Sequence, residues 1–391
     1  MILQMKKRVL VWETLSSIAG GQKMTLTVMD MLSDYFEFCC LIPASGMLSE
    51  ELQKRNIAHV FMGDQTLPTG FKGKTVIFRY GWLSIKNILK SLKVIRQFKP
   101  DILYCPGPAA LPWSAICGSI IKVPVIWHLH HIFLDEATKK LLNLCSQWKS
   151  VGKIIAISNC VGNQINNQIG REKTEILYNP VEICKYANGN AEKILDEIRN
   201  KLNSNGSDGL AENTLILSQI GAITKNKCQD LFIRTINEIK RRNKNVIGLI
   251  VGDVITEADR EYQKSIYKYI RENALQNNIF ALGFREDIAD ILSATDCVIV
   301  PSHEGLGLVA METMCARKRV VGMNSGGSEE IIRAAGCGET FPTGGTEKEV
   351  ADAVYRVLQQ KDEQLENGYR FCEQHGPVQY SNRLHEIFCN I

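Results

Sequence analysis

The 391-residue sequence lacks the features that mark membrane-spanning, disulfide-rich and zinc-binding proteins. No run of apolar residues approaches the roughly 20 residues that a helix needs to cross a bilayer. The 13 cysteines are odd in number and scattered, and no C-x-x-C pair occurs, which argues against a disulfide framework and a zinc site. The apolar run that ends at Glu13 is too short for the core of an export signal. We therefore expect a cytoplasmic protein whose first core strand lies in this run.

Charge is distributed unevenly along the chain, although the net charge is only +4. Residues 1–185 carry 22 Lys and Arg against 13 Asp and Glu, whereas the remaining residues carry 24 against 29. The stretch from Lys72 to Pro100 contains eight basic residues and no acidic residue. This asymmetry favours an anionic partner for the first half of the chain.

The length is too great for one comfortable hydrophobic core and suits two α/β domains of ordinary size. In each half, short apolar runs that predict strands alternate with amphipathic stretches that predict helices, which is typical of a parallel, doubly wound sheet. The expected strands are Arg8–Trp12, Glu37–Ile42, His59–Met62, Thr75–Phe78, Asp101–Cys105, Val123–His128 and Lys153–Ile157 in the first half, and Thr214–Ile220, Val246–Val251, Ile279–Leu282, Asp296–Val300 and Arg319–Gly322 in the second.

A polar segment separates the two halves. Residues 186–213 contain the sequence NSNGSDG, which suits a helix and a flexible surface loop, so we place the link between the domains near residues 181–213. We expect one Rossmann-like domain over residues 1–183 and a second over residues 184–376, with a C-terminal helix over residues 377–391 that packs back onto the first. Ligands of such sheets bind at the carboxyl ends of the strands, so the chemistry is expected in a cleft between two sheets that face each other.

One segment of the first half, residues 83–98, predicts a helix with two contrasting faces. Its apolar residues recur at helical spacing, and three lysines fall together on another face. The apolar residues are Ile85, Ile88, Leu89, Leu92 and Ile95, and the lysines are Lys86, Lys90 and Lys93. Two interpretations stay open: the lysines hold the protein at an anionic membrane surface, or the helix is docked in the core with its lysines in solvent.

The strongest local signal is CVIVPSHEGLGLVAMETM, which spans residues 297–314. An apolar strand is expected to end at Pro301, and after a glycine-bearing loop a helix is expected to begin near Gly307. The backbone amides and the dipole at such a helix start favour an anion such as a diphosphate. Glu304 and Glu312 flank this anion site as acceptors for hydroxyl groups. If the two glutamates are considered without the surrounding motif, a simpler interpretation is favoured: one caps the helix, and the other is exposed to solvent on it.

The same segment resembles a known family. EGLGLVAME resembles the E-x7-E motif of the retaining GT-B glycosyltransferases, particularly glycosyltransferase family 4, and the residues that follow, ETMCARKRVVGMNSGGSEEI, continue the likeness. Upstream, IGAITKNKCQDL resembles the phosphate motif of the family, and AISNCV and LYNPVE resemble segments at its domain crossover. The likeness covers most of the chain in the order of the family. It implies the GT-B fold, in which two Rossmann-like doubly wound domains face a central cleft.

The resemblance implies roles for individual residues of the second half. Glu312 would bind the ribose hydroxyl groups of the donor, Glu304 would contact the donor sugar, and Lys227 would neutralise the diphosphate as an electrostatic catalyst. The other donor-binding positions that it implies are Gly221, Gly305, Leu306, Gly307 and Leu308. Because GT-B enzymes generally use no metal at the diphosphate, we expect neither a metal nor a cofactor.

In the first half, Gly20 and Gly21 resemble the glycine loop of the family, although an ordinary strand–helix turn is an equal alternative. No G-x-G-x-x-G sequence follows the first strand, which counts against a dinucleotide-binding dehydrogenase. Farther along, WHLHH ends a strand. The likeness places the functional histidine at His130 and puts His131 in the acidic position of the family, while His128 lies on the same side of the strand as His130. The H-L-H sequence could instead hold a metal, but no paired cysteines or carboxylate cluster accompany it.

Three positions depart from the family pattern. Ala222 replaces the arginine that accompanies the lysine, and nearby Lys225 is a candidate to substitute for it. Arg317 and Arg319 stand where glycine and proline are usual, so the loop path there is expected to differ.

The resemblance implies a retaining, metal-independent hexosyltransferase that uses a UDP- or GDP-sugar in the synthesis of bacterial surface polysaccharide or glycolipid. Its acceptor would be a saccharide or a lipid-linked molecule, and it would work in the cytoplasm or peripherally at the inner face of the cell membrane. Nucleic acid is not expected as a partner. Two alternatives remain: a nucleotide-sugar epimerase of the same fold, which needs no acceptor, and a non-catalytic nucleotide-sugar-binding protein, which the missing arginine motivates.

Overall fold

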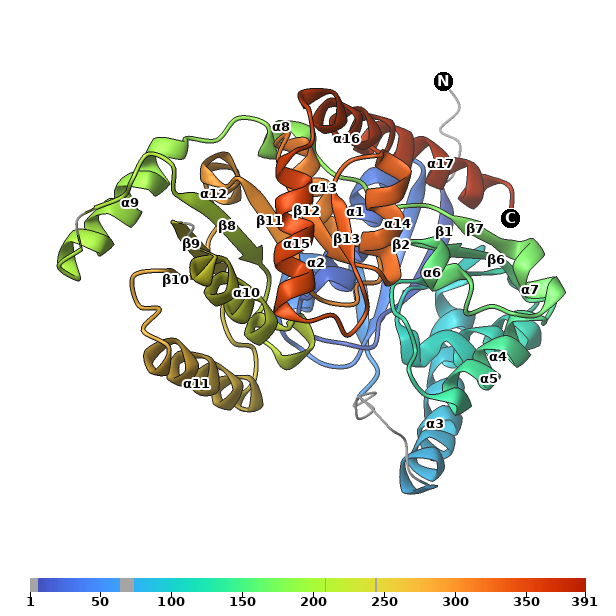
Figure 1. Cartoon of the computed structure of the whole chain (residues 1–391). Coiled ribbons are helices and arrows are strands. Elements are labelled where there is room, and N and C mark those ends of the chain that lie inside the picture. The colour runs from blue at the N-terminus through green and yellow to red at the C-terminus, as the bar shows by residue number, and fades with distance from the viewer. Residues whose placement is uncertain (1–5, 64–73, 208, 243–244) are drawn as a thin grey trace. The chain divides into compact units, whose positions relative to one another are not determined.

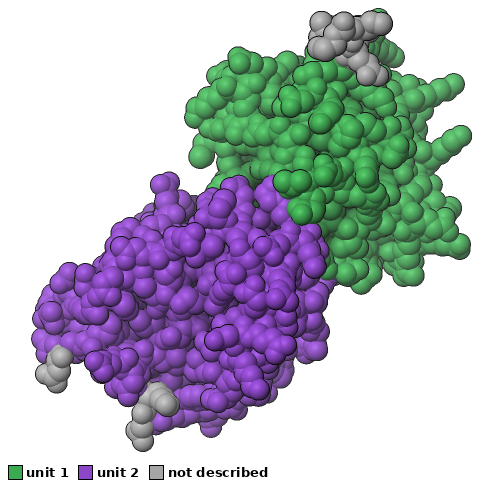
Figure 2. Space-filling view, turned by 90° about the horizontal axis from the view of Figure 1, so that it is seen from above, with its two compact units in different colours: residues 1–179, 378–391 green, residues 180–377 purple. Residues whose placement is uncertain are grey.

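The computed structural model describes residues 6–63, 74–207, 209–242 and 245–391. The chain forms two compact units, one of residues 1–179 with 378–391 and the other of residues 180–377 (Figure 2). The sequence suggested a boundary after residue 183. Lys72 of the basic stretch and Asp208 of the polar segment lie outside the described residues.

The first unit is built on a seven-stranded sheet with the strand order β3-β2-β1-β4-β5-β6-β7, and every pairing that the structure describes is parallel (Figure 1). The strands are β1 (Lys7–Trp12), β2 (Phe36–Ile42), β3 (Ala58–Phe61), β4 (Ile102–Cys105), β5 (Val125–Leu129), β6 (Val151–Ala156) and β7 (Thr174–Ile176). The helices are α1 (Gly20–Leu32), α2 (Met47–Lys54), α3 (Lys74–Phe98), the 3-10 turn η1 (Pro108–Ala110), α4 (Leu111–Ile121), α5 (Glu136–Ser146), α6 (Asn159–Gly162), α7 (Gln168–Lys173) and α17 (Pro377–Cys389). The strand order reverses between β1 and β4.

The second unit repeats this plan with six parallel strands in the order β10-β9-β8-β11-β12-β13. The strands are β8 (Leu215–Ile220), β9 (Val246–Val251), β10 (Ile279–Gly283), β11 (Cys297–Val300), β12 (Arg319–Met323) and β13 (Glu339–Phe341). The helices are α8 (Ile183–Tyr186), α9 (Ala191–Ser204), the 3-10 turn η2 (Lys225–Lys227), α10 (Gln229–Arg241), α11 (Glu257–Glu272), α12 (Ile288–Ala294), α13 (Leu308–Cys315), α14 (Gly326–Ala335), α15 (Glu347–Leu358) and α16 (Asp362–Gln374). Here the order reverses between β8 and β11. The prediction of two Rossmann-like α/β units is confirmed.

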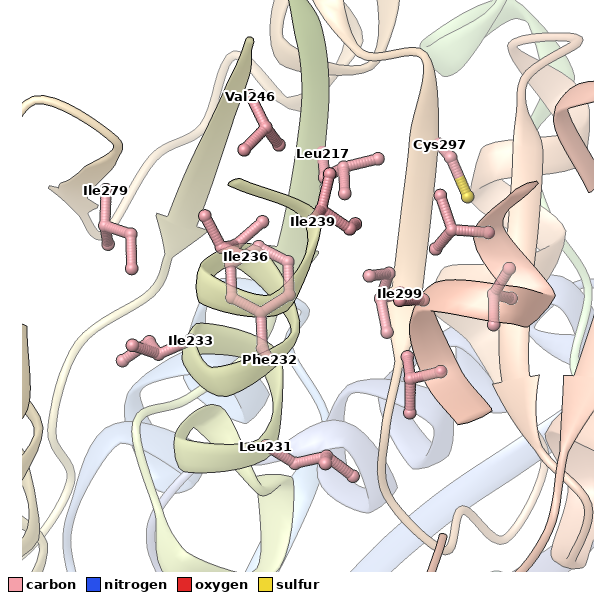
Figure 3. Packing of buried hydrophobic residues seen from close by; sticks show 14 of the residues in the cluster. Leu217, Leu231, Phe232, Ile233, Ile236, Ile239, Val246, Ile279, Cys297 and Ile299 are labelled. Atoms are coloured by element: carbon pink, nitrogen blue, oxygen red, sulfur yellow. The ribbon is translucent and has the colours of Figure 1, made fainter. Parts of the chain in front are cut away.

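The sheet of the second unit has a hydrophobic core on each face, because successive side chains of a strand point to opposite faces. Leu217 of β8 packs with α10, α11 and α15, whereas its neighbour Ile216 packs with α9 and α12. Figure 3 shows the first of these cores, where Phe232 and Ile236 of α10 meet residues of β8, β9 and β11. Because both faces are covered, these strands read in the sequence as nearly continuous apolar runs.

The last helix of the chain belongs to the core of the first unit. Tyr380, Leu384 and Phe388 of α17 are buried in one cluster with residues of β1 and β2. The Phe388 ring also lies against Tyr104 of β4, with ring centroids 5.3 Å apart. None of the helices that the structure describes is long and apolar enough to span a membrane.

The structure corrects three expectations of secondary structure. Residues 75–78 were expected to form a strand but belong to α3, because a four-residue apolar run does not by itself distinguish strand from helix. The edge strands β7 and β13 were not predicted, since three residues are too few to show a period of two. Ile85 and Leu89 were assigned to the apolar stripe of the helix, yet they are 59% and 64% exposed, because α3 docks through a different face.

Candidate functional site

The reversal of strand order in the second unit brings together two charged residues from distant parts of the sequence. Lys227 follows β8 and Glu304 follows β11, and these adjacent strands end at the same edge of the sheet. The Lys227 Nζ atom lies 2.6 Å from Oε1 and 2.8 Å from Oε2 of Glu304, and the Ser302 hydroxyl donates to the same carboxylate. A reversal point of this kind is where open α/β sheets bind ligands.

The loop from Glu304 to Gly307 is fixed against the start of α14. Glu304 forms a parallel bridge with Gly326, and the amide of Gly327 donates to the Glu304 carbonyl at 2.7 Å. Gly307 has a φ of 86°, and a Cβ atom there would lie 2.6 Å from the Ser328 Oγ. The close approach and the left-handed backbone therefore both require glycine at position 307. α13 begins at Leu308, close to the predicted start near Gly307, and the Leu306 side chain of the loop is buried.

A hydrogen bond to its backbone holds Lys227 in place. It ends the turn η2, and its carbonyl accepts a hydrogen bond from the Gln219 side-chain amide of β8 at 2.5 Å. Gly221, which directly follows β8, has a φ of 145°. A Cβ atom on Gly221 would lie 3.9 Å from Lys227 Cε, so this glycine flanks the lysine side chain.

Glu312 lies near the middle of α13 and is engaged by a tyrosine far away in the sequence. The Tyr186 hydroxyl donates to Glu312 Oε1 at 2.8 Å. Burial, and after it the neighbouring Glu312 carboxylate, raise the pKa of the Tyr186 phenol, so the phenol stays protonated and acts as the donor. Glu312 is the fifth residue of α13, little more than one turn from its start.

In the first unit, the reversal between β1 and β4 holds a buried carboxyl group. Glu13 directly follows β1 and is 2% exposed. It accepts hydrogen bonds from Thr25 Oγ1 at 2.5 Å, Gln22 Nε2 at 3.1 Å and the Thr14 amide at 3.3 Å. Burial raises the pKa of Glu13, although these hydrogen bonds oppose the shift. The carboxyl group thus ties the end of β1 to α1, the helix that begins with Gly20 and Gly21.

The three histidines of WHLHH lie at the end of β5 in the same unit. His128 and His130 are buried, with ring centroids 4.0 Å apart, and the His128 Nδ1 atom is 2.6 Å from the Tyr104 hydroxyl. His131 is exposed, and its Nε2 atom lies 4.0 Å from the position that a Cβ atom on Gly21 would take. The structure therefore brings Gly21 and His131 close together.

Burial decides the charge of the two inner histidines. It lowers the pKa of His128 to about 3, and together with the neighbouring imidazoles it holds the pKa of His130 well below its ordinary value. Both rings are therefore neutral at physiological pH. In neither ring does the buried Nε2 atom have a hydrogen-bond partner among the described residues.

The alternative that H-L-H holds a metal finds no support in the geometry. Among the described residues, no group of three or more His, Cys, Asp and Glu side chains is placed to hold a metal ion.

Two family models match the chain. Glycosyltransferase Family 4 matches residues 46–184, and Glycosyl transferases group 1 matches residues 200–370. The chain is a GT-B glycosyltransferase. A glycosyltransferase from Rickettsia africae has the same fold, with a TM-score of 0.74 at 19% identity over 98% of each chain.

Other relatives of this glycosyltransferase share its fold or part of its sequence. The Escherichia coli UDP-Gal:alpha-D-GlcNAc-diphosphoundecaprenol alpha-1,3-galactosyltransferase is 23% identical over 324 residues, which are 81% of this chain and 79% of that protein. The Streptomyces kanamyceticus alpha-D-kanosaminyltransferase is 30% identical over 38% of each chain. The structure of Anabaena HepE in complex with UDP has a TM-score of 0.79 at 20% identity and covers 98% of this chain and 100% of that one. The glycosyltransferase therefore transfers sugar from a nucleotide-sugar donor to an acceptor.

Two departures from the family pattern can be located in the glycosyltransferase. Lys225, the candidate substitute for the arginine missing at Ala222, is exposed on η2, and Lys227 makes the ion pair with Glu304. Arg317 has a φ of 52°, a backbone conformation that favours glycine. Its guanidinium lies 3.4 Å from the centroid of the Tyr369 ring and pairs with Glu366 at 2.8 Å.

Sequence reasoning missed two residues of the candidate site in the glycosyltransferase. Glu13 carried a signal that could have found it, because an acidic residue directly after a buried strand lies where catalytic groups collect. Tyr186 carried no such signal, since 126 residues separate it from Glu312 in the sequence.

Proposed function

We propose that this glycosyltransferase transfers a hexosyl group from a UDP- or GDP-sugar to an acceptor, with retention at the anomeric carbon and without a metal ion. The observation that carries the proposal is the ion pair between Lys227 and Glu304. It presents an ammonium group and a carboxylate beside the backbone amides before α13. A sugar diphosphate needs such a set of groups, because its phosphates are anionic and its sugar offers hydroxyl donors.

In the proposed reaction, the bond between the anomeric carbon and the diphosphate breaks, and its electron pair stays on the phosphate oxygen. Lys227 stabilises the negative charge that develops on this leaving group. The acceptor hydroxyl oxygen forms the new bond to the anomeric carbon on the face that the diphosphate leaves, and its proton passes to the departing phosphate oxygen. Catalysis is then mainly positioning and charge stabilisation, and a strong side-chain base is not needed.

Each remaining residue of the candidate site has a binding role in this proposal. Glu304 holds hydroxyl groups of the donor sugar, and Glu312 holds those of the ribose. His130 is assigned to the sugar that is transferred, because a neutral imidazole can donate or accept a hydrogen bond without gaining charge. The diphosphate is assigned to Gly20, Gly21, Gly221, Gly305, Leu306, Gly307 and Leu308, and the acceptor side to His128 and His131.

We also place the reaction in the synthesis of bacterial surface polysaccharide or glycolipid, at the inner face of the cell membrane. The Escherichia coli relative is named for an acceptor linked to diphosphoundecaprenol, which supports a lipid-linked acceptor. The Anabaena HepE structures with UDP and with UDP-glucose favour a uridine donor. Lys86, Lys90 and Lys93 are exposed on α3 and supply positive charge toward such a membrane.

The test is a panel of UDP- and GDP-sugars offered with lipid-linked and saccharide acceptors in the presence of EDTA, with nucleotide release and the anomeric configuration of the product measured. We expect release to depend on an acceptor, to survive EDTA and to yield a product with the anomeric configuration of the donor. A donor converted to its epimer without an acceptor would establish the epimerase alternative. Donor binding without turnover on any acceptor would establish the non-catalytic alternative.

A further inference from the structure

Helix α3 is docked on the first unit by a face of small, polar and aliphatic residues. Leu83, Asn87 and Ser91 are buried at helical spacing. Next to them, the indole of Trp113 in α4 donates to the Ser84 hydroxyl at 2.6 Å. Contacts within the first unit therefore hold this face of the helix in place.

The opposite face of α3 carries three large apolar side chains that are exposed. Trp82 is 67% exposed, Ile85 is 59% exposed and Leu89 is 64% exposed. Three exposed lysines lie between and beyond them at spacings of three and four residues, so both sets share one face. The lysines are Lys86, Lys90 and Lys93. In Figure 1 one end of α3 projects beyond α4 and α5 of the same unit.

Ordinary helix docking accounts for the lysines but not for the apolar row. A docked helix normally turns its large apolar residues inward and its lysines outward. In α3 several aliphatic residues are buried in this way, together with an asparagine and a serine, but a tryptophan, an isoleucine and a leucine lie in solvent. Single exposed apolar residues are common, whereas a row of three on one helix face marks an interaction surface.

The charge of the segment restricts the partner. No acidic residue occurs between Lys72 and Pro100, so nothing within the segment neutralises the lysines. Lys90 donates to the carbonyl of Phe61 at 2.7 Å and remains exposed, which orients its charge along the surface. An apolar row interleaved with unopposed cations complements an anionic bilayer, where acyl chains and phosphate groups lie at adjacent depths.

We propose that the exposed face of α3 is a membrane-insertion surface. Trp82, Ile85 and Leu89 enter the interfacial layer of an anionic bilayer, where tryptophan is favoured because its ring is both apolar and a hydrogen-bond donor. Lys86, Lys90 and Lys93 bind the phosphate groups of the lipids at the level of the interface. The inference deepens the proposed function and rests on it for the lipid-linked acceptor, but binding to vesicles can be measured without any donor.

The experiment is co-sedimentation of the full chain with vesicles of phosphatidylcholine, with and without phosphatidylglycerol. Two variants separate charge from insertion: the lysine variant removes the cations only, and the apolar variant removes the apolar row only. The lysine variant is K86Q/K90Q/K93Q, and the apolar variant is W82S/I85S/L89S. Matched controls change residues elsewhere in the chain that are also exposed, K240Q/K264Q/K268Q and L134S/I255S/V378S.

We expect the wild type and both controls to bind vesicles that contain phosphatidylglycerol. The lysine variant should lose about 100-fold in partitioning, which corresponds to about 1 kcal/mol for each cation. The apolar variant should lose about tenfold or more. Tryptophan emission of the wild type should shift to the blue with anionic vesicles, and this shift should be absent in a Trp82→Phe variant.

Three outcomes would overturn the proposed insertion surface. The wild type does not bind anionic vesicles, the control variants lose as much vesicle binding as the α3 variants, or the apolar variant binds vesicles like the wild type. The last result would leave electrostatic attachment only. A thermal-shift measurement with UDP and GDP on the same proteins keeps the two proposals apart. Vesicle binding without any nucleotide binding would refute the donor assignment and leave the surface intact.

Discussion

The Lys227 ammonium group contacts both carboxylate oxygens of Glu304, at 2.6 and 2.8 Å, across 77 residues of sequence. This contact exists because β8 and β11 are neighbours in the sheet although β9 and β10 intervene in the chain. A diphosphate at the start of α13 would compete with Glu304 for the same ammonium group. In the proposed reaction the carboxylate therefore holds the lysine before the donor binds, and it is released for the sugar hydroxyl groups when the phosphate engages the lysine.

The first prediction concerns Lys227. Lys227→Met should lower kcat by about 100- to 1,000-fold, because the charge that develops on the leaving diphosphate loses its cation. Steady-state nucleotide release checks this. Lys225→Met is the matched control in the same turn and should change kcat by less than about tenfold. Equal losses in the two variants would show that the turn needs positive charge in general and that position 227 has no special role.

The second prediction concerns the donor to Glu312. Tyr186→Phe removes one hydrogen bond to a carboxylate that we assign to the ribose, so the donor KM should rise by about tenfold while kcat changes little. Tyr262→Phe is the matched control, because its hydroxyl donates to Asp230 at 2.8 Å in the same unit. If KM rose equally in the Tyr262→Phe control, the effect would come from a general loss of stability and the role assigned to Tyr186 would be refuted.

The positions of most strands could be predicted because a strand that is buried on both faces consists of consecutive apolar residues. Val246–Val251 is buried along its whole length and reads as one apolar run. Residues 75–78 present a similar run within a helix of 25 residues. Gly81 lies between that run and the predicted helix, and α3 continues through it at a cost of about 1 kcal/mol relative to alanine.

Several residues of the candidate site could be named from the sequence, but the contacts between them could not. Lys227 and Glu304 each stand in a motif that follows a strand, so each could be named from local sequence. Their pairing depends on the order of strands in the sheet, which a single sequence does not contain. The Tyr186–Glu312 hydrogen bond could not be foreseen either, because 126 residues separate the two side chains.

The third prediction is a loss of stability at mildly acidic pH. Since burial lowers the pKa of His128 to about 3 and holds that of His130 well below its ordinary value, the folded protein keeps both rings neutral while the unfolded chain protonates them near pH 6.5. Below that pH the unfolded state binds more protons. The free energy of unfolding should therefore fall by up to about 1.4 kcal/mol for each histidine with every pH unit by which the pH is lowered.

Urea denaturation between about pH 5 and pH 8 measures this dependence, and His130→Gln should make it shallower by about one proton. The raised pKa of buried Glu13 acts in the opposite direction, because its contribution to stability is present at low pH and is lost as pH rises. An unchanged slope in the His130 variant would contradict the assignment of the neutral ring.

The last prediction uses the left-handed backbone at Arg317, where φ is 52°. A side chain in this conformation costs about 1–2 kcal/mol, and the contacts with Tyr369 and Glu366 offset part of that cost. Arg317→Ala removes the contacts and keeps the strain, whereas Arg317→Gly removes both. In urea denaturation the glycine variant should therefore be more stable than the alanine variant by about 1 kcal/mol.

The matched control is Arg333, which lies in α14 and pairs with Glu329 at 2.8 Å. In a right-handed helix glycine is less stable than alanine by about 1 kcal/mol, so the order of the two variants should be reversed at this position. If glycine were the less stable variant at both positions, the strain at Arg317 would be refuted, and the family's preference for glycine at this turn would need a cause other than the backbone.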